Sequence, residues 1–314
     1  MLVALNRVNP YSYNQDPTLK KMIDVVPFGL PDIKPIHNRE VLKGKIDGIG
    51  KDDFVIIWGG GIYNWFDPLT LIRAMAEIGE DRDDIKLFFM GVKHPNPKVR
   101  KLQLADETVE LAKKLNAYNS SVFFNPGWVE YESRQNYLLE SDVGIITHPE
   151  HIETRFSFRT RILDYLWTGL PIISTKGDYL SELIEKNGLG ITTRDGNTSD
   201  VAKAIIKLAD DKEFYTRCVS NIESIAKEYT WEKVCQPLIG FCKDPAFSAA
   251  RNKLKEGGVE GSINDSREMS IAEDNAGDNN RKNAAYLVKR FFYHLSHSGP
   301  GKTSKFLSNY IKRK

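Results

Sequence analysis

The chain has 314 residues, of which 41% are hydrophobic and 27% are charged, and its formal net charge is +2. This composition fits a globular protein of one large or two ordinary domains, and so small a net charge gives no reason to expect nucleic-acid binding. The sequence shows no pattern typical of a signal peptide and no apolar run of about 18 residues, and its three cysteines suggest reduced thiols, so a cytoplasmic protein is expected.

Residues 1–48 are predicted to be mostly extended, because five prolines interrupt them. From Asp53 onward, short apolar runs alternate with segments of helical periodicity. Six runs have strand length: Phe54–Trp58, Ile85–Met90, Ser121–Phe124, Asp142–Thr147, Pro171–Ser174 and Gly190–Thr193. Helical patterns begin at Asp67 and occupy Leu102–Leu115, Glu132–Leu139, Thr160–Trp167, Leu180–Lys186, Ser199–Leu208, Lys212–Glu228 and Trp231–Phe241.

This alternation predicts an α/β domain over residues 49–243, in which helices cover both faces of a doubly wound parallel sheet. Residues 244–283 are rich in Asn, Asp, Glu, Gly and Ser and are predicted to be a flexible linker. Residues 281–314 contain nine Lys or Arg and no Asp or Glu, with interleaved aromatic residues. We therefore expect a helical, basic amphipathic tail over residues 284–314.

That tail has three interpretations. Its cations and aromatic side chains suit a membrane surface with anionic headgroups. The same segment could instead pack on a preceding domain, or it could remain a solvated tail. The membrane interpretation is slightly favoured and would place the protein at the inner face of the cell membrane.

A run of three glycines follows the first predicted strand. Gly60 and Gly61 permit close approach of a ligand to the backbone, and the next helix offers unpaired N–H groups to an anion. The run matches neither the dinucleotide-binding fingerprint nor a phosphate-binding P-loop. A ligand-binding loop and a structural tight turn are therefore both open.

The segment His151–Asp164 follows the fourth predicted strand and leads into a helix near Thr160. Arg155, Arg159 and Arg161 surround that helix start, and guanidinium groups beside a helix N-terminus suit a diphosphate. The segment lies at the carboxyl edge of the sheet, where open α/β folds bind ligands. Asp164, one turn into the helix, could accept hydrogen bonds from ribose hydroxyls; a solvated basic loop and an exposed helix charge are the structural alternatives.

Two further residues have a structural and a binding interpretation. Asp178 could cap the following helix, which is the favoured interpretation, or contact a ligand. Trp128 could flank a nucleobase, although an aromatic residue in this position is more often packed. The histidines His148 and His151 have no accompanying carboxylates in a metal-ligand pattern, so no metal and no cofactor are expected.

Taken in order, these segments resemble the GT-B glycosyltransferases, in particular the retaining glycosyltransferase family 4. Residues 23–31 (IDVVPFGLP) resemble the segment that leaves the family's N-terminal domain, and residues 141–146 (SDVGII) resemble the strand before its sugar-binding loop. Residues 163–173 (LDYLWTGLPII) are similar to the family's LEAMAxGxPVI motif. This likeness covers about residues 22–235 and implies that residues 49–243 are a Rossmann-like donor-binding domain.

The resemblance also implies roles for individual residues. Asp164 takes the place of the second Glu of the family's E-x7-E motif, which binds the ribose. Phe158, Arg159 and Thr160 would hold the turn whose N–H groups meet the donor diphosphate, and Gly60 and Gly61 would face the donor phosphate. Loss of Arg159 is therefore expected to weaken diphosphate binding.

The chain also departs from the family pattern. The first Glu of the motif falls on Phe156, and the family's basic pair after the first strand falls on Gly61 and Phe66. One of the neighbouring arginines, Arg155, Arg159 or Arg161, is expected to supply the missing positive charge.

Residues 1–48 would be only the remnant of an N-terminal acceptor domain and the interdomain segment. A separate chain could supply that domain. The resemblance therefore implies the donor half of a glycosyltransferase, one that moves a sugar from a nucleotide-diphosphate sugar to a glycan or lipid-linked hydroxyl during polysaccharide or lipopolysaccharide synthesis. It identifies no catalytic base. A non-catalytic nucleotide-sugar-binding or interaction module is the alternative, and a sugar-nucleotide epimerase of related fold is a more distant one.

Overall fold

The computed structural model describes residues 13–14, 16–19, 23–92, 96 and 102–245. Within it, Val25–Asp244 form one compact unit, which contains the elements described below. The described residues of the other unit include a turn in which the Leu19 amide donates to the Asp16 carbonyl at 3.0 Å. The predicted linker and basic tail, residues 244–283 and 284–314, lie almost entirely outside the described residues.

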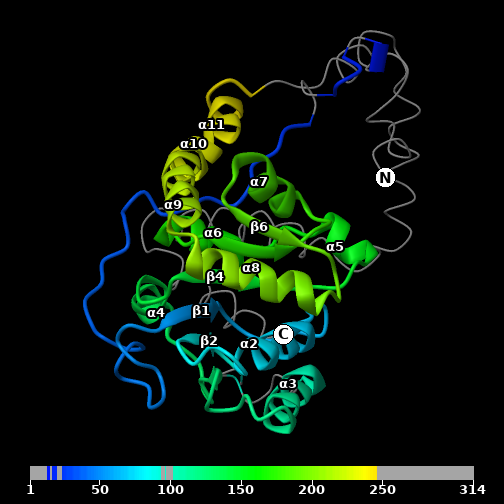
Figure 1. Cartoon of the computed structure of the whole chain (residues 1–314). Helices are drawn as coiled ribbons and strands as arrows, with labels where there is room; N and C mark the ends of the chain where they lie inside the picture. Colours follow the sequence, from blue (N-terminus) through cyan, green and yellow to red (C-terminus); the bar gives the residue numbers. More distant parts are fainter. Residues whose placement is uncertain (1–12, 15, 20–22, 93–95, 97–101, 246–314) are drawn as a thin grey trace, which may run out of the picture. The chain divides into compact units, whose positions relative to one another are not determined.

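The compact unit is built on one six-stranded parallel sheet (Figure 1). Its strands are β1 (Phe54–Trp58), β2 (Ile85–Phe89), β3 (Val122–Phe124), β4 (Val143–Ile146), β5 (Ile172–Thr175) and β6 (Gly190–Thr193), in the order β3-β2-β1-β4-β5-β6. The chain moves outward from β1 in one direction and from β4 in the other, so the order reverses between these two neighbours. Open sheets of this kind bind ligands in the crevice beyond the carboxyl ends of such a pair. The predicted doubly wound α/β fold is confirmed.

The helices form the outer layers. Right-handed crossovers place α2 (Pro68–Ile78) and α3 (Gln103–Lys114) on one face and α6 (Arg161–Thr168) and α7 (Tyr179–Asn187) on the other, because the chain travels along the sheet in opposite directions on its two sides. Helix α8 (Thr198–Asp210) packs on α2, and α9 (Lys212–Ala226) packs on α6. The bounds of the helices up to β6 are α2 (Pro68–Ile78), α3 (Gln103–Lys114), the 3-10 turn η1 (Tyr131–Ser133), α4 (Arg134–Leu139), α5 (Ile152–Phe156), α6 (Arg161–Thr168) and α7 (Tyr179–Asn187).

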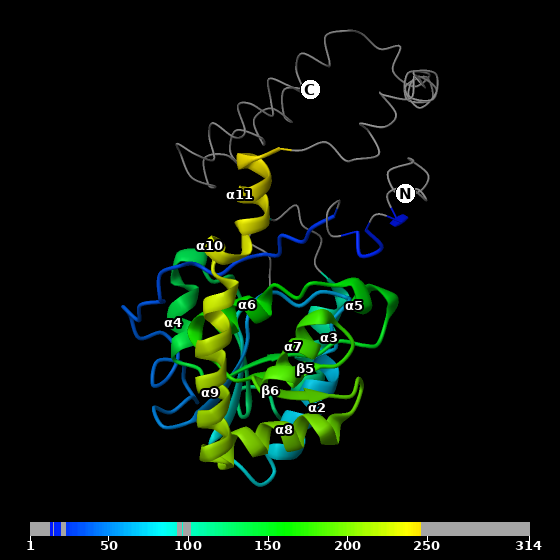
Figure 2. The same ribbon diagram turned by 90° about the horizontal axis from the view of Figure 1, so that it is seen from above.

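After the sheet is complete, the chain continues as helices: α8 (Thr198–Asp210), α9 (Lys212–Ala226), the 3-10 turn η2 (Lys227–Tyr229), α10 (Trp231–Val234) and α11 (Gln236–Lys243). Helices α9, α10 and α11 follow one another as a column (Figures 1 and 2). Among the described residues, no helix combines the length and the apolar character needed to cross a bilayer.

Residues 25–48, which the sequence assigns to the end of a preceding domain, lie within the compact unit. Glu140, directly after α4, accepts hydrogen bonds from the backbone N–H groups of Val41, Leu42 and Lys43 at 2.9, 2.7 and 3.0 Å. Nearer the start of residues 25–48, Leu30 donates its N–H to the Tyr229 carbonyl at 2.6 Å. These contacts hold the segment that includes Phe28 and Pro31 beside the carboxyl edge of the sheet.

Candidate active site

A cavity of about 600 Å³ opens beyond the carboxyl ends of β1 and β4. Its walls include the loop after β1, the α4 region, the α5–α6 loop with the start of α6, and residues 28–31. This is the position at which the strand order reverses, so the topology of the sheet itself provides the site.

The glycine loop forms one wall. Gly60 has a φ of +117°, which L side chains rarely adopt, and an added Cβ would lie 3.2 Å from the Arg161 guanidinium. The Trp58 indole N–H donates to the Gly61 carbonyl at 3.4 Å. The glycines thus allow this backbone to pass directly against a cationic side chain on the opposite wall.

Arg161 is the first residue of α6, and it is the positively charged side chain on the wall opposite the glycine loop. Its guanidinium lies 4.9 Å from the ring centre of Trp58 and 4.6 Å from that of Phe66, and Nη2 donates to the Gly61 carbonyl at 2.8 Å. Its Nη1 is buried and has no hydrogen-bond partner among the described residues. Burial lowers the pKa of Arg161. A cation with an unused donor, next to a helix N-terminus, is poised to bind an anion.

Arg134 and Asp164 form an ion pair on another wall. The Arg134 Nε donates to Asp164 Oδ1 at 3.1 Å, and the guanidinium is sandwiched 3.7 Å from the Tyr131 ring centre and 4.8 Å from that of Trp167. Burial raises the pKa of Asp164, and the charge of Arg134 opposes that rise. The pair fixes a carboxylate whose side chain is still 35% exposed toward the cavity.

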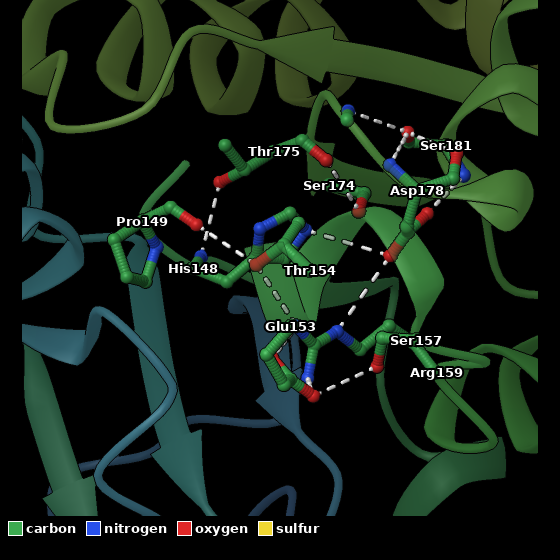
Figure 3. Close-up of polar contacts among 11 residues, drawn as sticks. His148, Pro149, Glu153, Thr154, Ser157, Arg159, Ser174, Thr175, Asp178 and Ser181 are labelled. Atoms are coloured by element: carbon green, nitrogen blue, oxygen red, sulfur yellow. Dashed lines mark hydrogen bonds and ion pairs between the residues drawn. The ribbon is translucent and has the colours of Figure 1, made fainter. Parts of the chain in front are cut away.

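Arg159 occupies a different environment from Arg161, although only one residue separates them. Its guanidinium donates to both oxygens of Glu153, at 3.2 and 2.8 Å, and to the Thr154 hydroxyl at 3.1 Å (Figure 3). The Arg159 side chain is 3% exposed, whereas that of Glu153 is 44% exposed. Arg159 therefore holds the Glu153 carboxylate on the cavity wall, and two of its three nitrogens are already bonded.

Behind Arg159 lies a buried pair, His148 and Asp178 (Figure 3). Asp178 Oδ2 is 3.6 Å from His148 Nε2 and 3.7 Å from Arg159 Nε. Burial lowers the pKa of His148 and so favours the neutral imidazole. Asp178 is also the N-cap of α7, where Oδ1 accepts from the Ser181 N–H at 2.6 Å. The helix-capping prediction for Asp178 is confirmed.

Aromatic side chains line the mouth of the cavity. Tyr63 and Trp65, both in the loop between β1 and α2, are stacked with ring centres 4.8 Å apart and an interplanar angle of 1°. Trp65 is 47% exposed. Trp128 lines the same cavity and packs against Gly91, where an added Cβ would lie 3.2 Å from its ring. Trp128 is thus both packed and part of the cavity wall.

The cavity brings together most of the residues that the sequence singles out. Seven of the eight predicted binding residues line it: Gly60, Gly61, Phe158, Arg159, Thr160, Arg161 and Asp164. Arg155 is exposed on α5 and is not among the lining residues. Phe156, which occupies the position of the family's first Glu, is 80% exposed and is not a lining residue either.

Sequence reasoning missed several polar lining residues, among them Glu153, Arg134 and Tyr131. Glu153 lies three positions before Phe156, Arg134 begins α4, and Tyr131 packs on Arg134. A signal was available for Glu153, because it is the carboxylate within the arginine-rich segment. Arg134 comes from a helix 30 residues before Asp164, and only the fold brings it close. Among the described residues, no three His, Cys, Asp or Glu side chains are grouped as a metal ion would require.

Known glycosyltransferases resemble this chain in sequence. The family model of the group 1 glycosyl transferases matches residues 53–211. An uncharacterised glycosyltransferase of Methanocaldococcus jannaschii is 23% identical over 212 residues, which are 63% of this chain and 50% of that protein.

Two solved structures share the fold. Anabaena HepE in complex with UDP-glucose has a TM-score of 0.51 and 19% identity, over 61% of this chain and 49% of that chain. WaaG, a glycosyltransferase involved in lipopolysaccharide biosynthesis, has a TM-score of 0.52 and 16% identity, over 74% of this chain and 60% of its own. The chain thus spans about half of the archaeal relative and of HepE.

Proposed function

The chain belongs to the group 1 glycosyl transferases, and on this premise we propose that its cavity binds a nucleotide-diphosphate sugar as the donor half of a GT-B enzyme. Arg161 carries the proposal, because it combines a buried guanidinium, an unused Nη1 donor and a position at the start of α6. The neighbouring Gly60 has no side chain, so the backbone passes close to the Arg161 guanidinium and this cation lies at the glycine loop of the cavity. HepE, of the same fold, has been solved with UDP-glucose, and this supports a donor of that class.

The remaining cavity residues suit the other parts of such a donor. Asp164, oriented by Arg134, offers carboxylate oxygens to ribose hydroxyls. Thr160 is the N-cap of α6, so the positive end of the helix dipole faces the cavity next to Arg161. We propose that the donor binds without a cofactor, because Arg161 and the positive end of the α6 dipole supply positive charge.

The proposed reaction transfers a glycosyl group to an acceptor hydroxyl. The bond from the anomeric carbon to the diphosphate oxygen breaks, the acceptor oxygen bonds to that carbon, and the proton of the acceptor hydroxyl passes to the departing diphosphate. Negative charge grows on the departing diphosphate, so Arg161 stabilises the transition state more than the ground state. The resemblance to family 4 implies retention of configuration. We assign no catalytic base, and we propose that a partner N-terminal domain supplies the acceptor site.

The proposed acceptor is a glycan or lipid-linked hydroxyl of a cell-surface polysaccharide or lipopolysaccharide. WaaG, which shares the fold, acts in lipopolysaccharide biosynthesis and supports this choice. A cytoplasmic location, with residues 281–314 at the inner membrane surface, is consistent with it and remains a proposal. Co-sedimentation with anionic liposomes, with and without those residues, tests it: equal partitioning contradicts an anchor.

The direct test is a calorimetric titration of the full chain with UDP, GDP and ADP. We expect one of them to bind, and we expect Arg161→Gln to weaken that binding by about 30-fold, the loss of a charged hydrogen bond to phosphate. Arg155→Gln is the matched control, since this arginine is exposed on α5 and does not line the cavity. Failure of every nucleotide to bind, or equal losses in the two variants, would contradict a diphosphate site at Arg161.

The alternative function, a non-catalytic binding or interaction module, makes a different prediction. Such a module would bind the nucleotide sugar without ever releasing its sugar, even when the acceptor domain is supplied in trans. Slow hydrolysis of the bound donor, detected as free sugar and lost in Arg161→Gln, would favour the transferase.

A further inference from the structure

The loop between β1 and α2 presents an aromatic surface, and its exposed residue Trp65 has no part in the proposed diphosphate site. Tyr63 and Trp65 stack with parallel rings, and Phe66 lies 6.0 Å from Trp65 at an interplanar angle of 54°. Trp65 remains 47% exposed at the cavity mouth. A tryptophan with so much apolar surface in water, beside a cavity, is a ready contact for an apolar ligand face.

The surface is held rigidly. The Phe66 N–H donates to the Tyr63 carbonyl at 3.0 Å and closes a turn around Trp65. At the end of the loop, the Asp67 N–H donates to the Thr147 carbonyl at 2.9 Å, and the Thr147 hydroxyl donates to the Asp67 carbonyl at 2.6 Å. These bonds tie the loop to the end of β4, so little conformational entropy is lost when a ligand binds on it.

The neighbouring polar groups indicate which kind of ring suits this surface. Phe66 also lies 5.4 Å from the Arg159 guanidinium, and Arg159 in turn fixes Glu153. An ionised carboxylate accepts hydrogen bonds and donates none. A ligand that stacks on Trp65 and reaches this wall should therefore be rich in hydroxyl donors around an apolar face. A pyranose ring has this character, because its axial C–H bonds form an apolar face and its hydroxyls form the rim.

We propose that Trp65, supported by Tyr63, is a stacking platform for a saccharide ring, and that Glu153 accepts hydrogen bonds from the hydroxyls of that saccharide. This inference rests on the proposed function for the presence of a sugar in the cavity. The ring belongs either to the donor sugar or to a saccharide acceptor. Trp65 then determines which saccharide the cavity accepts. It directly precedes Phe66, one of the two positions at which the family pattern has a basic residue.

The first arm of the test compares a nucleotide with its sugar conjugate. The full chain is titrated with whichever nucleoside diphosphate it binds and with the corresponding nucleotide-glucose. If the donor sugar uses the platform, Trp65→Ala weakens binding of the conjugate about tenfold and leaves the nucleotide within twofold, in line with the free energy of one aromatic contact. Trp65→Phe, which keeps a ring, restores most of the loss.

The second arm uses maltose as the probe and saturation-transfer NMR as the readout. If an acceptor saccharide uses the platform, the wild type transfers magnetisation to the C–H protons of maltose and Trp65→Ala does not. Tyr118→Ala is the control, because Tyr118 is 38% exposed and does not line the cavity. Circular dichroism verifies that each variant is folded.

The outcomes are separable. Loss in either arm supports the platform and identifies the source of the ring. An equal loss for the nucleotide and its conjugate would show that a nucleobase stacks on Trp65, and no loss in both arms would show that no ring does; each result overturns the proposal. If no nucleotide binds to the wild type, the proposed function fails while the maltose arm still decides the fate of the platform.

Discussion

At the residue scale, the site depends on two arginines that the sequence cannot tell apart. Only Thr160 separates Arg159 from Arg161, but the helix start turns their side chains to different surroundings. Two nitrogens of Arg159 donate to Glu153 and its unbonded Nε faces Asp178 at 3.7 Å, whereas the buried Nη1 of Arg161 has no hydrogen-bond partner among the described residues. Spacing alone indicated a cluster of positive charge. Only the buried partners of each side chain distinguish Arg159, which has a structural role, from Arg161, which is the proposed binding cation.

Replacing Arg159 by Met should therefore destabilise the fold. The change removes a cation that is 3% exposed and leaves Oδ2 of the buried Asp178 carboxylate facing the imidazole of His148 at 3.6 Å without the positive charge of Arg159. We expect a loss of about 3 kcal/mol in the free energy of unfolding, typical of breaking one side of a buried ion pair. Urea denaturation measures it.

Arg155→Met is the control for that measurement, because it removes the same charge from an exposed position in the same segment. The control should change the unfolding free energy by less than about 0.5 kcal/mol. Equal effects of the two substitutions would contradict the structural role of Arg159.

At the element scale, the strands were the most predictable part of the chain. The predicted run Phe54–Trp58 and the predicted Gly190–Thr193 coincide with β1 and β6, and the other four agree within one residue at each end. Buried parallel strands are continuous apolar runs, so their signal is local. The predicted helix start at Asp67-Pro68 is also confirmed, with Asp67 accepting from the Thr70 N–H at 3.1 Å.

Two helical features differ from the prediction. Helix α5 has only five residues and too little length to show a period. The predicted helix Trp231–Phe241 is divided at Cys235 into α10 and α11, because Pro237 has no N–H to continue the ladder of the preceding turn. Contacts between distant segments, such as Glu140 with residues 41–43, left no local signal at all.

The Glu140 contact predicts a pH-dependent stability. Although burial favours the protonated acid, the hydrogen bonds from His37 and from the Leu42, Val41 and Lys43 amides hold the pKa of Glu140 below its usual value of 4.5. A depressed pKa in the folded state contributes stability above the unfolded pKa and loses it as the pH falls through the folded pKa.

Glu140→Gln should therefore lower the unfolding free energy by about 2 kcal/mol at pH 7. The difference in unfolding free energy between this variant and the wild type should become smaller as the pH falls from 5 to 3. Urea denaturation at pH 7, 5 and 3.5 measures it, with Glu132→Gln, an exposed acid of the preceding 3-10 turn, as the control. A difference that stays constant with pH would show that the ionised carboxylate does not hold residues 41–43.

At the scale of the whole molecule, the compact unit Val25–Asp244 contains every residue of the candidate site. The sequence could predict this site in outline, because parallel strands deliver their following loops to one edge. It could not predict which side chains would face the cavity: Arg155 lies outside it, and Glu153 and Arg134 lie inside. Whether a side chain faces the cavity depends on the short helix α5 and on contacts between residues about 30 positions apart in the sequence, such as Arg134 with Asp164.

The most direct test of the central claim is hydrogen–deuterium exchange of the full chain with and without the nucleoside diphosphate that it binds. If that ligand lies between the glycine loop and the start of α6, amides in residues 59–66 and 157–164 should exchange more slowly in its presence, and those of α3 should not change. Protection confined to other segments, with none at residues 59–66 and 157–164, would contradict a donor site in this cavity.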